Sequence, residues 1–208
     1  MAEALEEIVI SQESSNFFDE LISFILMVSS LAPSIELQND RKTTKWLPTQ
    51  YIVFEPGRAF RDFQIRVYPY EIINLISKNI WPSKFVIIKE PFIHSVQEHP
   101  VSINCIQMVH GTIIQSTFSQ YYENIKSTIE EKFGKEVENW PNVWNFARVV
   151  RNAFSHGGRI KISNSKAPKI VWRELEYDYY SNGKSIMYTD LTAVELIFLM
   201  IEMDSHII

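Results

Sequence analysis

The sequence predicts a mainly α-helical fold, a helical bundle that carries small β-hairpins. The first observation is that apolar residues recur at every third or fourth position, which places them on one face of a helix. This recurrence is found in residues 15–31, 100–133, 144–156 and 190–203. The second observation is a pair of turn signals, Pro56-Gly57 and Asn182-Gly183, each lying between short segments of strand character.

Two helices are expected in the N-terminal half. Residues 15–31 are strongly apolar, and Pro33 follows the end of the pattern. Residues 71–80 also look helical and end at Trp81-Pro82, because a proline disfavours helical geometry in the residue before it. Residues 1–90 are thus expected to contribute helices and a hairpin.

Two hairpins are expected. Residues 51–54 and 63–67 have strand character on either side of Pro56-Gly57. Residues 169–178 and 185–188 flank Asn182-Gly183, a dipeptide that is typical of tight hairpin turns. The second hairpin should form a small ribbon on the helical bundle.

The remaining helices lie in the C-terminal half. The longest covers residues 100–133 and ends at Gly134, because glycine tolerates the left-handed conformation that terminates helices. The last, residues 190–203, begins with a capping-box pattern at Thr192 and Glu195. With residues 144–156 they make up a core of residues 100–208, and we expect residues 1–208 to form a single domain.

Residues 144–156 form a helix with a chemically varied face. One side is apolar, and the other carries Arg148, Arg151, Asn152, Ser155 and His156. Two glycines follow and can stop the helix, which places His156 in its last turn. Two guanidinium groups, a carboxamide, a hydroxyl and an imidazole therefore share one short surface.

The stretch from Arg151 to His156 resembles the R-x4-6-H motif of the HEPN superfamily, in which a polar residue, often asparagine, commonly follows the arginine. Asn152 occupies that position, and the motif closes an amphipathic helix. The resemblance covers about residues 100–206 as a pattern, and it is specific only at the six motif positions.

The resemblance implies a bundle of four core helices. In active members of the family, two protomers place their motifs against each other across a two-fold interface to form one composite, metal-independent ribonuclease site. Carried over to this chain, Arg151 and His156 would be the catalytic pair, and Asn152 would orient them. The resemblance further implies a homodimer, a toxin–antitoxin or anti-phage setting, and an antitoxin or other regulatory protein as partner.

The residue types suit such a reaction. Cleaving RNA internally requires that the 2′-hydroxyl loses a proton and that the 5′-oxygen is stabilised or protonated as it leaves. An imidazole exchanges protons at neutral pH, and a guanidinium binds phosphate oxygens and stabilises developing charge. The resemblance, together with the lack of a convincing metal cluster in the sequence, implies an endoribonuclease without a cofactor that leaves a 2′,3′-cyclic phosphate and a 5′-hydroxyl.

The charge pattern is consistent with an RNA partner. Residues 139–173 hold seven basic residues and no acidic one, whereas the rest of the chain holds 13 basic and 25 acidic residues. A local excess of this size can attract a polyanion although the net charge is −5. We assign as candidate RNA contacts Arg148, Ser155, Arg159 and Lys161.

Four alternatives stay open at the level of sequence. Acidic residues from elsewhere could fold over the basic segment. Arg151 and Asn152 could pair with carboxylates of a neighbouring helix while His156 caps a helix C-terminus. The chain could also be a non-catalytic HEPN domain that binds RNA or nucleotides or dimerises, or an unrelated helical interaction protein.

Other kinds of site lack their signatures. Glycine-rich phosphate loops and Cys-x-x-Cys pairs are absent, and His94 and His99 have no third His or Cys at ligand spacing, so no metal site is expected.

The single cysteine, Cys105, excludes an internal disulfide and fits a reducing compartment. The first seven residues lack the positive charge of a signal peptide, and the longest apolar run is shorter than the ~20 residues that cross a bilayer. We expect a cytoplasmic protein with no membrane segment.

Overall fold

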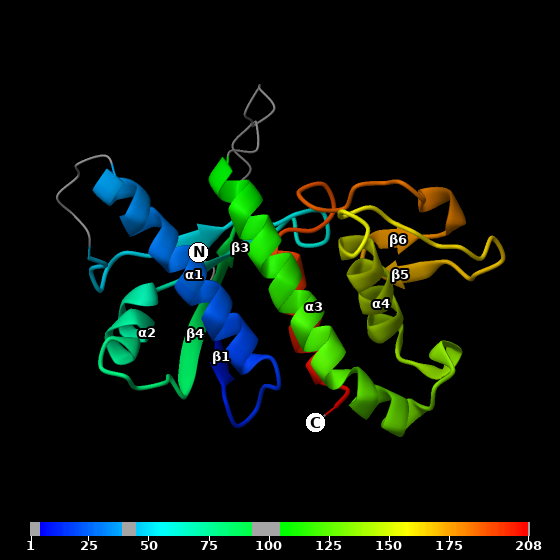
Figure 1. Ribbon diagram of the computed structural model, residues 1–208, viewed down its shortest axis with the longest axis horizontal. Coiled ribbons are helices and arrows are strands. Elements are labelled where there is room, and N and C mark those ends of the chain that lie inside the picture. Colours follow the sequence, from blue (N-terminus) through cyan, green and yellow to red (C-terminus); the bar gives the residue numbers. More distant parts are fainter. Residues whose placement is uncertain (1–4, 39–44, 93–104, 208) are drawn as a thin grey trace.

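The computed structural model describes residues 5–38, 45–92 and 105–207. Within them lie five α-helices, a four-stranded antiparallel sheet and a separate two-stranded sheet (Figure 1). The prediction of a mainly α-helical bundle with four core helices is therefore wrong, because a chain that is 45% helix and 18% strand has a mixed α/β fold. The error arises in residues 5–92, where short segments far apart in the sequence pair as strands.

The larger sheet consists of β1 (Glu6–Ser11), β2 (Ile52–Phe54), β3 (Phe63–Val67) and β4 (Lys84–Pro91) in the order β1-β4-β3-β2. The N-terminal hairpin is confirmed, because β2 and β3 pair antiparallel with Ile52 opposite Val67. Strands β1 and β4 are missing from the sequence prediction. They pair with Ile8 opposite Ile87, a long-range contact that neither segment reveals alone.

Helix α1 (Phe18–Gln38) packs on this sheet. The ring of Phe18 lies 5.9 Å from that of Phe85 in β4, and the ring of Phe24 lies 5.5 Å from that of Phe54 in β2. The helix continues past Pro33, where the sequence places its end. Proline weakens a helix by removing one hydrogen bond, but here the helix extends on both sides of it. Helix α2 (Pro69–Ile76) lies next to α1.

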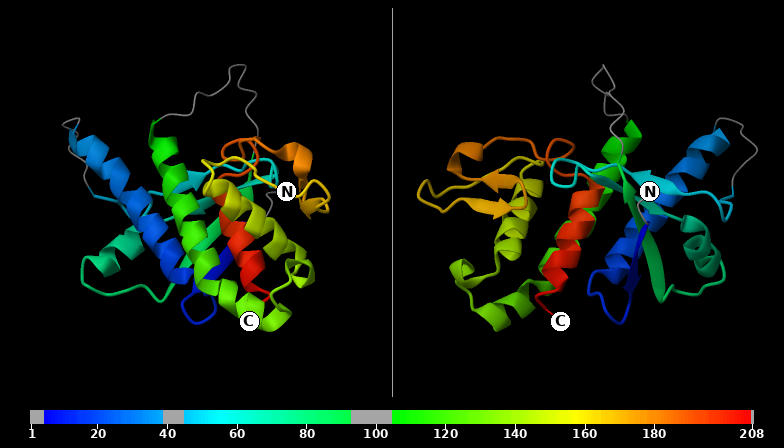
Figure 2. Two further views of the ribbon diagram at one scale, coloured as in Figure 1. Left: turned by 45° about the vertical axis from the view of Figure 1, so that its right-hand side comes forward. Right: turned by 180° about the vertical axis from the view of Figure 1, so that it is seen from behind.

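Helix α3 (Cys105–Phe133) runs through the middle of the molecule and contacts α1, α4 (Asn142–Phe154) and α5 (Ala193–Asp204) (Figure 1). Seen from behind, α5 lies in front of α3 (Figure 2). Gly134 ends α3 with a φ of 86°, as predicted, and a short 3-10 helix, η1 (Val137–Asn139), follows. No helix in the described part of the chain is long and apolar enough to cross a membrane.

The hairpin predicted at Asn182-Gly183 is wrong. The strands that pair are β5 (Ile170–Trp172) and β6 (Leu175–Tyr177), and the turn between them is at Arg173-Glu174. The side chain of Asn182 instead accepts a hydrogen bond from the backbone N–H of Ile162 and donates one to its carbonyl. The dipeptide therefore holds a distant loop, and this tertiary contact replaces its local preference for a hairpin turn.

The capping box of α5 is confirmed. The side chain of Thr192 accepts a hydrogen bond from the backbone of α5, and Glu195 accepts one from the backbone N–H of Thr192 at 2.9 Å. Glu195 is fully buried and also accepts the N–H of Gly57 at 2.8 and 2.9 Å. Burial raises the pKa of Glu195, and these donors oppose the rise. One carboxylate thus caps α5 and fixes the loop after β2.

Candidate functional site

Helix α4 has an apolar face and a polar face, as predicted. The apolar face is buried and consists of Val143, Trp144, Phe146, Ala147, Val149, Val150 and Ala153. Trp144 also donates a hydrogen bond from its indole N–H to the carbonyl of Met203 in α5, at 3.0 Å. On the opposite face Arg148, Arg151 and Asn152 are half-buried and Ser155 is exposed. Packing of the apolar face therefore fixes the direction in which the motif side chains project.

The glycines after the motif end the helix, as predicted. Gly157 and Gly158 have φ values of 69° and 76°, a region that favours glycine. The N–H of Gly158 and that of His156 both donate to the carbonyl of Ala153, each at 2.9 Å. Helix α4 ends at Phe154, so His156 lies just beyond its last turn, and its side chain is exposed.

Arg151 makes an ion pair with the neighbouring helix. Its Nε lies 2.5 Å from Oε1 of Glu123 in α3. The side chains are 37% and 45% exposed, so the pair contributes at most about 1 kcal/mol to stability. The charge of the motif arginine is nevertheless compensated within the protomer.

Arg148 also faces α3 and lies close to Tyr122, which is buried there. Burial raises the pKa of Tyr122, and the positive charges of Arg148 and Arg151 act against the rise. The Nε of Arg148 is buried and has no hydrogen-bond partner among the described residues. Arg148 therefore belongs to the packing between α3 and α4.

Asn152 holds the loop that follows the helix. Its side-chain N–H donates to the carbonyl of Lys161 at 2.7 Å. The same loop is fixed by buried Ile160, whose N–H donates to the carbonyl of Lys184 at 2.9 Å. The two hydrogen bonds between Asn182 and Ile162, at 2.6 and 2.8 Å, complete the attachment. Hydrogen bonds thus hold the loop of residues 158–163 in place beside the end of α4.

A shallow groove runs along this loop. It is lined by His156, Arg159, Ile160, Lys161, Ile162, Ser163, Tyr179, Asn182 and Gly183. His156, Arg159 and Lys161 are exposed. The side chains of His156 and Lys161 make no hydrogen bond or ion pair with any residue that the structure describes, whereas Arg159 donates to the carbonyl of Gly183 at 2.9 Å. The groove therefore offers an imidazole and two cations to a ligand.

No known family model, curated protein or solved structure matches this chain. The resemblance to HEPN proteins thus rests on the residues from Arg151 to His156, and the site is interpreted from its own geometry. His94 and His99 lie outside the described residues. In the part of the chain that is described, no three His, Cys, Asp or Glu side chains come together in a way that could hold a metal ion.

The structure separates the predicted site residues into two groups. His156, Arg159 and Lys161 line the groove. Arg148, Arg151, Asn152 and Ser155 do not line it, and the hydroxyl of Ser155 makes only a long hydrogen bond of 3.4 Å to the carbonyl of Arg151. The motif is therefore continuous in sequence but divided in space.

The basic segment is also divided. Lys169 lies 2.7 Å from Glu176, and Arg173 forms an ion pair with Glu202. With Arg151 and Glu123, these contacts show that acidic residues compensate three of the seven basic side chains. Lys161 and Lys166 form no ion pair within the described ranges, and Arg159 bonds only to a backbone carbonyl. The open positive charge is concentrated on the loop after α4.

Sequence reasoning missed Tyr179 and Asn182 as groove residues. Tyr179 belongs to the short 3-10 helix η2 (Tyr179–Ser181), which follows β6. Both residues come from a segment well beyond the motif. Long-range hydrogen bonds bring this segment alongside the loop, among them the two between Asn182 and Ile162 and the one from the N–H of Gly183 to the carbonyl of Ile160. The run of two tyrosines before a polar turn is the one signal that could have drawn attention to them.

Proposed function

We propose that the protein is an endoribonuclease that binds RNA in the groove after α4 and cleaves it without a metal ion. The observation that carries this proposal is the exposed His156 beside Arg159 and Lys161 in one groove. The fold plays no part in the argument, because function depends on the site rather than on the architecture that carries it.

The roles follow from the chemistry of the side chains. Arg159 and Lys161 bind the phosphate and stabilise the charge that develops on it. The imidazole of His156 accepts the proton of the 2′-hydroxyl, whose oxygen attacks phosphorus while the bond to the 5′-oxygen breaks. The leaving 5′-oxygen takes up a proton. The products are a 2′,3′-cyclic phosphate and a 5′-hydroxyl.

A second copy of the chain would complete this site. One groove offers a single imidazole, whereas proton removal and proton donation occur on opposite sides of the phosphorus. We therefore propose a homodimer in which two motifs face each other, so that the second His156 acts as the acid and Arg151 reaches the substrate of the partner. The resemblance of the motif to HEPN ribonucleases supports this arrangement.

The direct test is cleavage of a labelled RNA of mixed sequence in EDTA. We expect the wild-type protein to cut and His156→Ala to be about 10²–10⁴-fold slower. His206→Ala is the matched control, because it removes another exposed histidine after α5. Equal loss in both variants, or products with a 3′-hydroxyl and a 5′-phosphate, would contradict the proposed mechanism. Sedimentation analysis of each variant establishes its oligomeric state.

A non-catalytic RNA-binding protein is the second candidate. The specific observation in its favour is the ion pair between Arg151 and Glu123, which occupies the motif arginine. In this case the wild-type protein binds the RNA in EDTA and leaves it intact, and His156→Ala lowers affinity without any effect on the substrate. Binding and cleavage measured on the same RNA separate the two candidates.

A further inference from the structure

Two tyrosines stand exposed beside the groove. Tyr179 is 39% exposed and Tyr180 is 91% exposed. Their ring centroids are 6.0 Å apart, and the ring planes are nearly perpendicular, at 81°. A ligand that covers such rings removes apolar surface from water, and this burial is favourable for binding.

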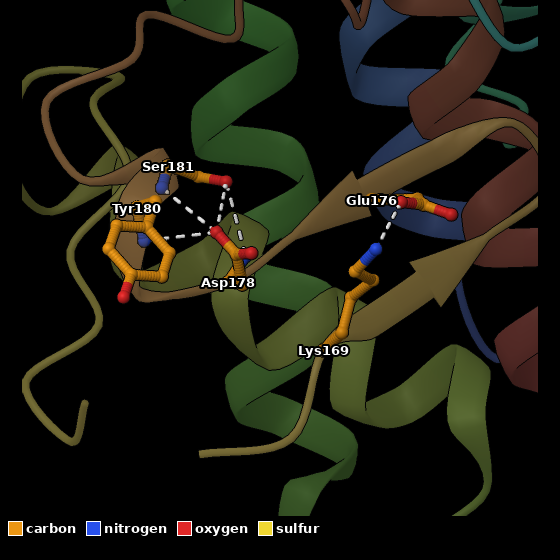
Figure 3. A network of polar contacts seen from close by, with 5 residues as sticks. All are labelled: Lys169, Glu176, Asp178, Tyr180 and Ser181. Carbon is orange, nitrogen blue, oxygen red and sulfur yellow. Dashed lines mark hydrogen bonds and ion pairs between the residues drawn. The ribbon is translucent and has the colours of Figure 1, made fainter. Parts of the chain in front are cut away.

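The turn that carries these rings is firmly held. The carboxylate of Asp178 accepts the N–H groups of Tyr180 and Ser181 at 2.9 and 3.1 Å, and the hydroxyl of Ser181 accepts the N–H of Asp178 at 3.1 Å. Figure 3 shows this network, with the ring of Tyr180 pointing away from Asp178. Because the backbone is already ordered, a ligand that stacks on the rings loses little of its binding energy to ordering the turn.

The chemistry next to the rings is that of a phosphate-binding surface. Tyr179 lines the same groove as Arg159 and Lys161. Lys169, also drawn in Figure 3, takes no part, because Glu176 compensates its charge at 2.7 Å. Cations on one wall and aromatic rings at the edge are the two elements by which proteins hold single strands of nucleic acid.

We infer that Tyr179 and Tyr180 bind one unpaired base of an RNA strand whose phosphate is held by Arg159 and Lys161. The substrate class is therefore single-stranded RNA, since the faces of paired bases are covered by their neighbours in a duplex. Because the rings are nearly perpendicular, a flat base stacks on one ring and meets the other with its edge. This inference rests on the proposed function, from which it takes RNA as the ligand.

The test measures binding of a 2′-O-methyl oligonucleotide, which cannot be cleaved by attack of a 2′-hydroxyl, so the wild-type protein can be used. We expect Tyr179→Ala and Tyr180→Ala each to weaken binding of the single strand about tenfold, and the phenylalanine variants to bind as the wild type does. Tyr51→Ala is the control, because it removes an exposed tyrosine next to strand β2. The duplex form of the same sequence should bind more weakly than the single strand.

A series of oligonucleotides with one abasic position each locates the base. With the wild-type protein, affinity should fall at one position, and in the tyrosine-to-alanine variants this fall should disappear. Tyrosine variants that bind the single strand like the wild type, or a duplex that binds equally well, would overturn the inference while RNA cleavage and the role of His156 stand. If the wild-type protein binds no RNA of either form, the proposed function fails with it.

Discussion

Residues 148–152 and residues 156–161 are close neighbours in the sequence and both are rich in basic side chains, but the structure uses them differently. The first group, which we call the inner segment, faces α3 and the loop: Arg151 pairs with Glu123 and Asn152 holds the carbonyl of Lys161. The second, the open segment, presents His156 and Lys161 to solvent.

The difference shows that basic residues in the sequence do not by themselves make a positively charged surface, because neighbouring acidic residues can compensate them. A half-exposed arginine beside a carboxylate offers a ligand little net charge, whereas an exposed lysine without a neighbouring acid keeps all of its charge. Within one protomer the inner segment therefore fixes the site, and the open segment presents uncompensated charge to a ligand. Arg151 would reach RNA only across the proposed dimer interface. Three substitutions test this division.

The largest effect is expected in the open segment. Lys161→Glu should weaken RNA binding about tenfold near physiological salt and reduce the slope of the logarithm of affinity against the logarithm of salt concentration by about one. Only the side chain changes, so the hydrogen bond from Asn152 to its carbonyl remains. Fluorescence anisotropy over a salt series measures both quantities. Lys84→Glu, at the exposed start of β4, has the same change in charge and should have little effect.

A smaller effect, and one on stability, is expected in the inner segment. Asn152→Ala leaves the carbonyl of Lys161 without its donor and should lower the free energy of unfolding by about 1 kcal/mol. Ser155→Ala, at the residue that follows the end of α4, removes only a long hydrogen bond and should change stability by less than about 0.5 kcal/mol. Urea unfolding compares the two. Equal losses would show that Asn152 does not hold the loop.

The smallest effect is expected at the ion pair between the inner segment and α3. Glu123→Gln removes the charge that compensates Arg151 and should raise affinity for RNA about threefold, because one additional cation then faces the ligand. Glu131→Gln, also exposed on α3, changes the net charge equally. If both variants bind RNA equally well, the charge of Arg151 does not contribute to RNA binding, and the inner segment has a structural role only.

The parts of the fold that were predicted correctly depend on neighbours in the sequence. The two-faced pattern of α4, the glycines after it and the capping box at Thr192 and Glu195 are all decided within one or two helical turns. The hairpin of β2 and β3 is also local. Each of these elements carries its own signal, so periodicity and turn chemistry are sufficient to find it.

The parts that could not be predicted depend on partners far along the chain. Strand β1 exists because β4 provides its hydrogen bonds, and Asn182 leaves its expected turn because Ile162 offers it two. The same applies to the candidate site: nothing near Arg151 in the sequence shows that Glu123 will lie beside it. Residue types suggested the chemistry, but only the fold shows which charges are free.

The contact between Gly57 and Glu195 ties the half of the molecule that bears the groove to the half that bears the larger sheet. A side chain at position 57 would place a carbon atom 2.9 Å from the carbonyl oxygen of Asp190 and from the carboxylate of Glu195, so even alanine there would displace the start of α5. The sheet half thus supplies one donor, the N–H of Gly57, to the buried carboxylate of Glu195 in the half that bears the groove. Residues 105–207 transplanted alone would leave that carboxylate short of partners. The groove therefore depends on the sheet half. Residues 105–207 alone should lose folding stability before they lose affinity for the ligand.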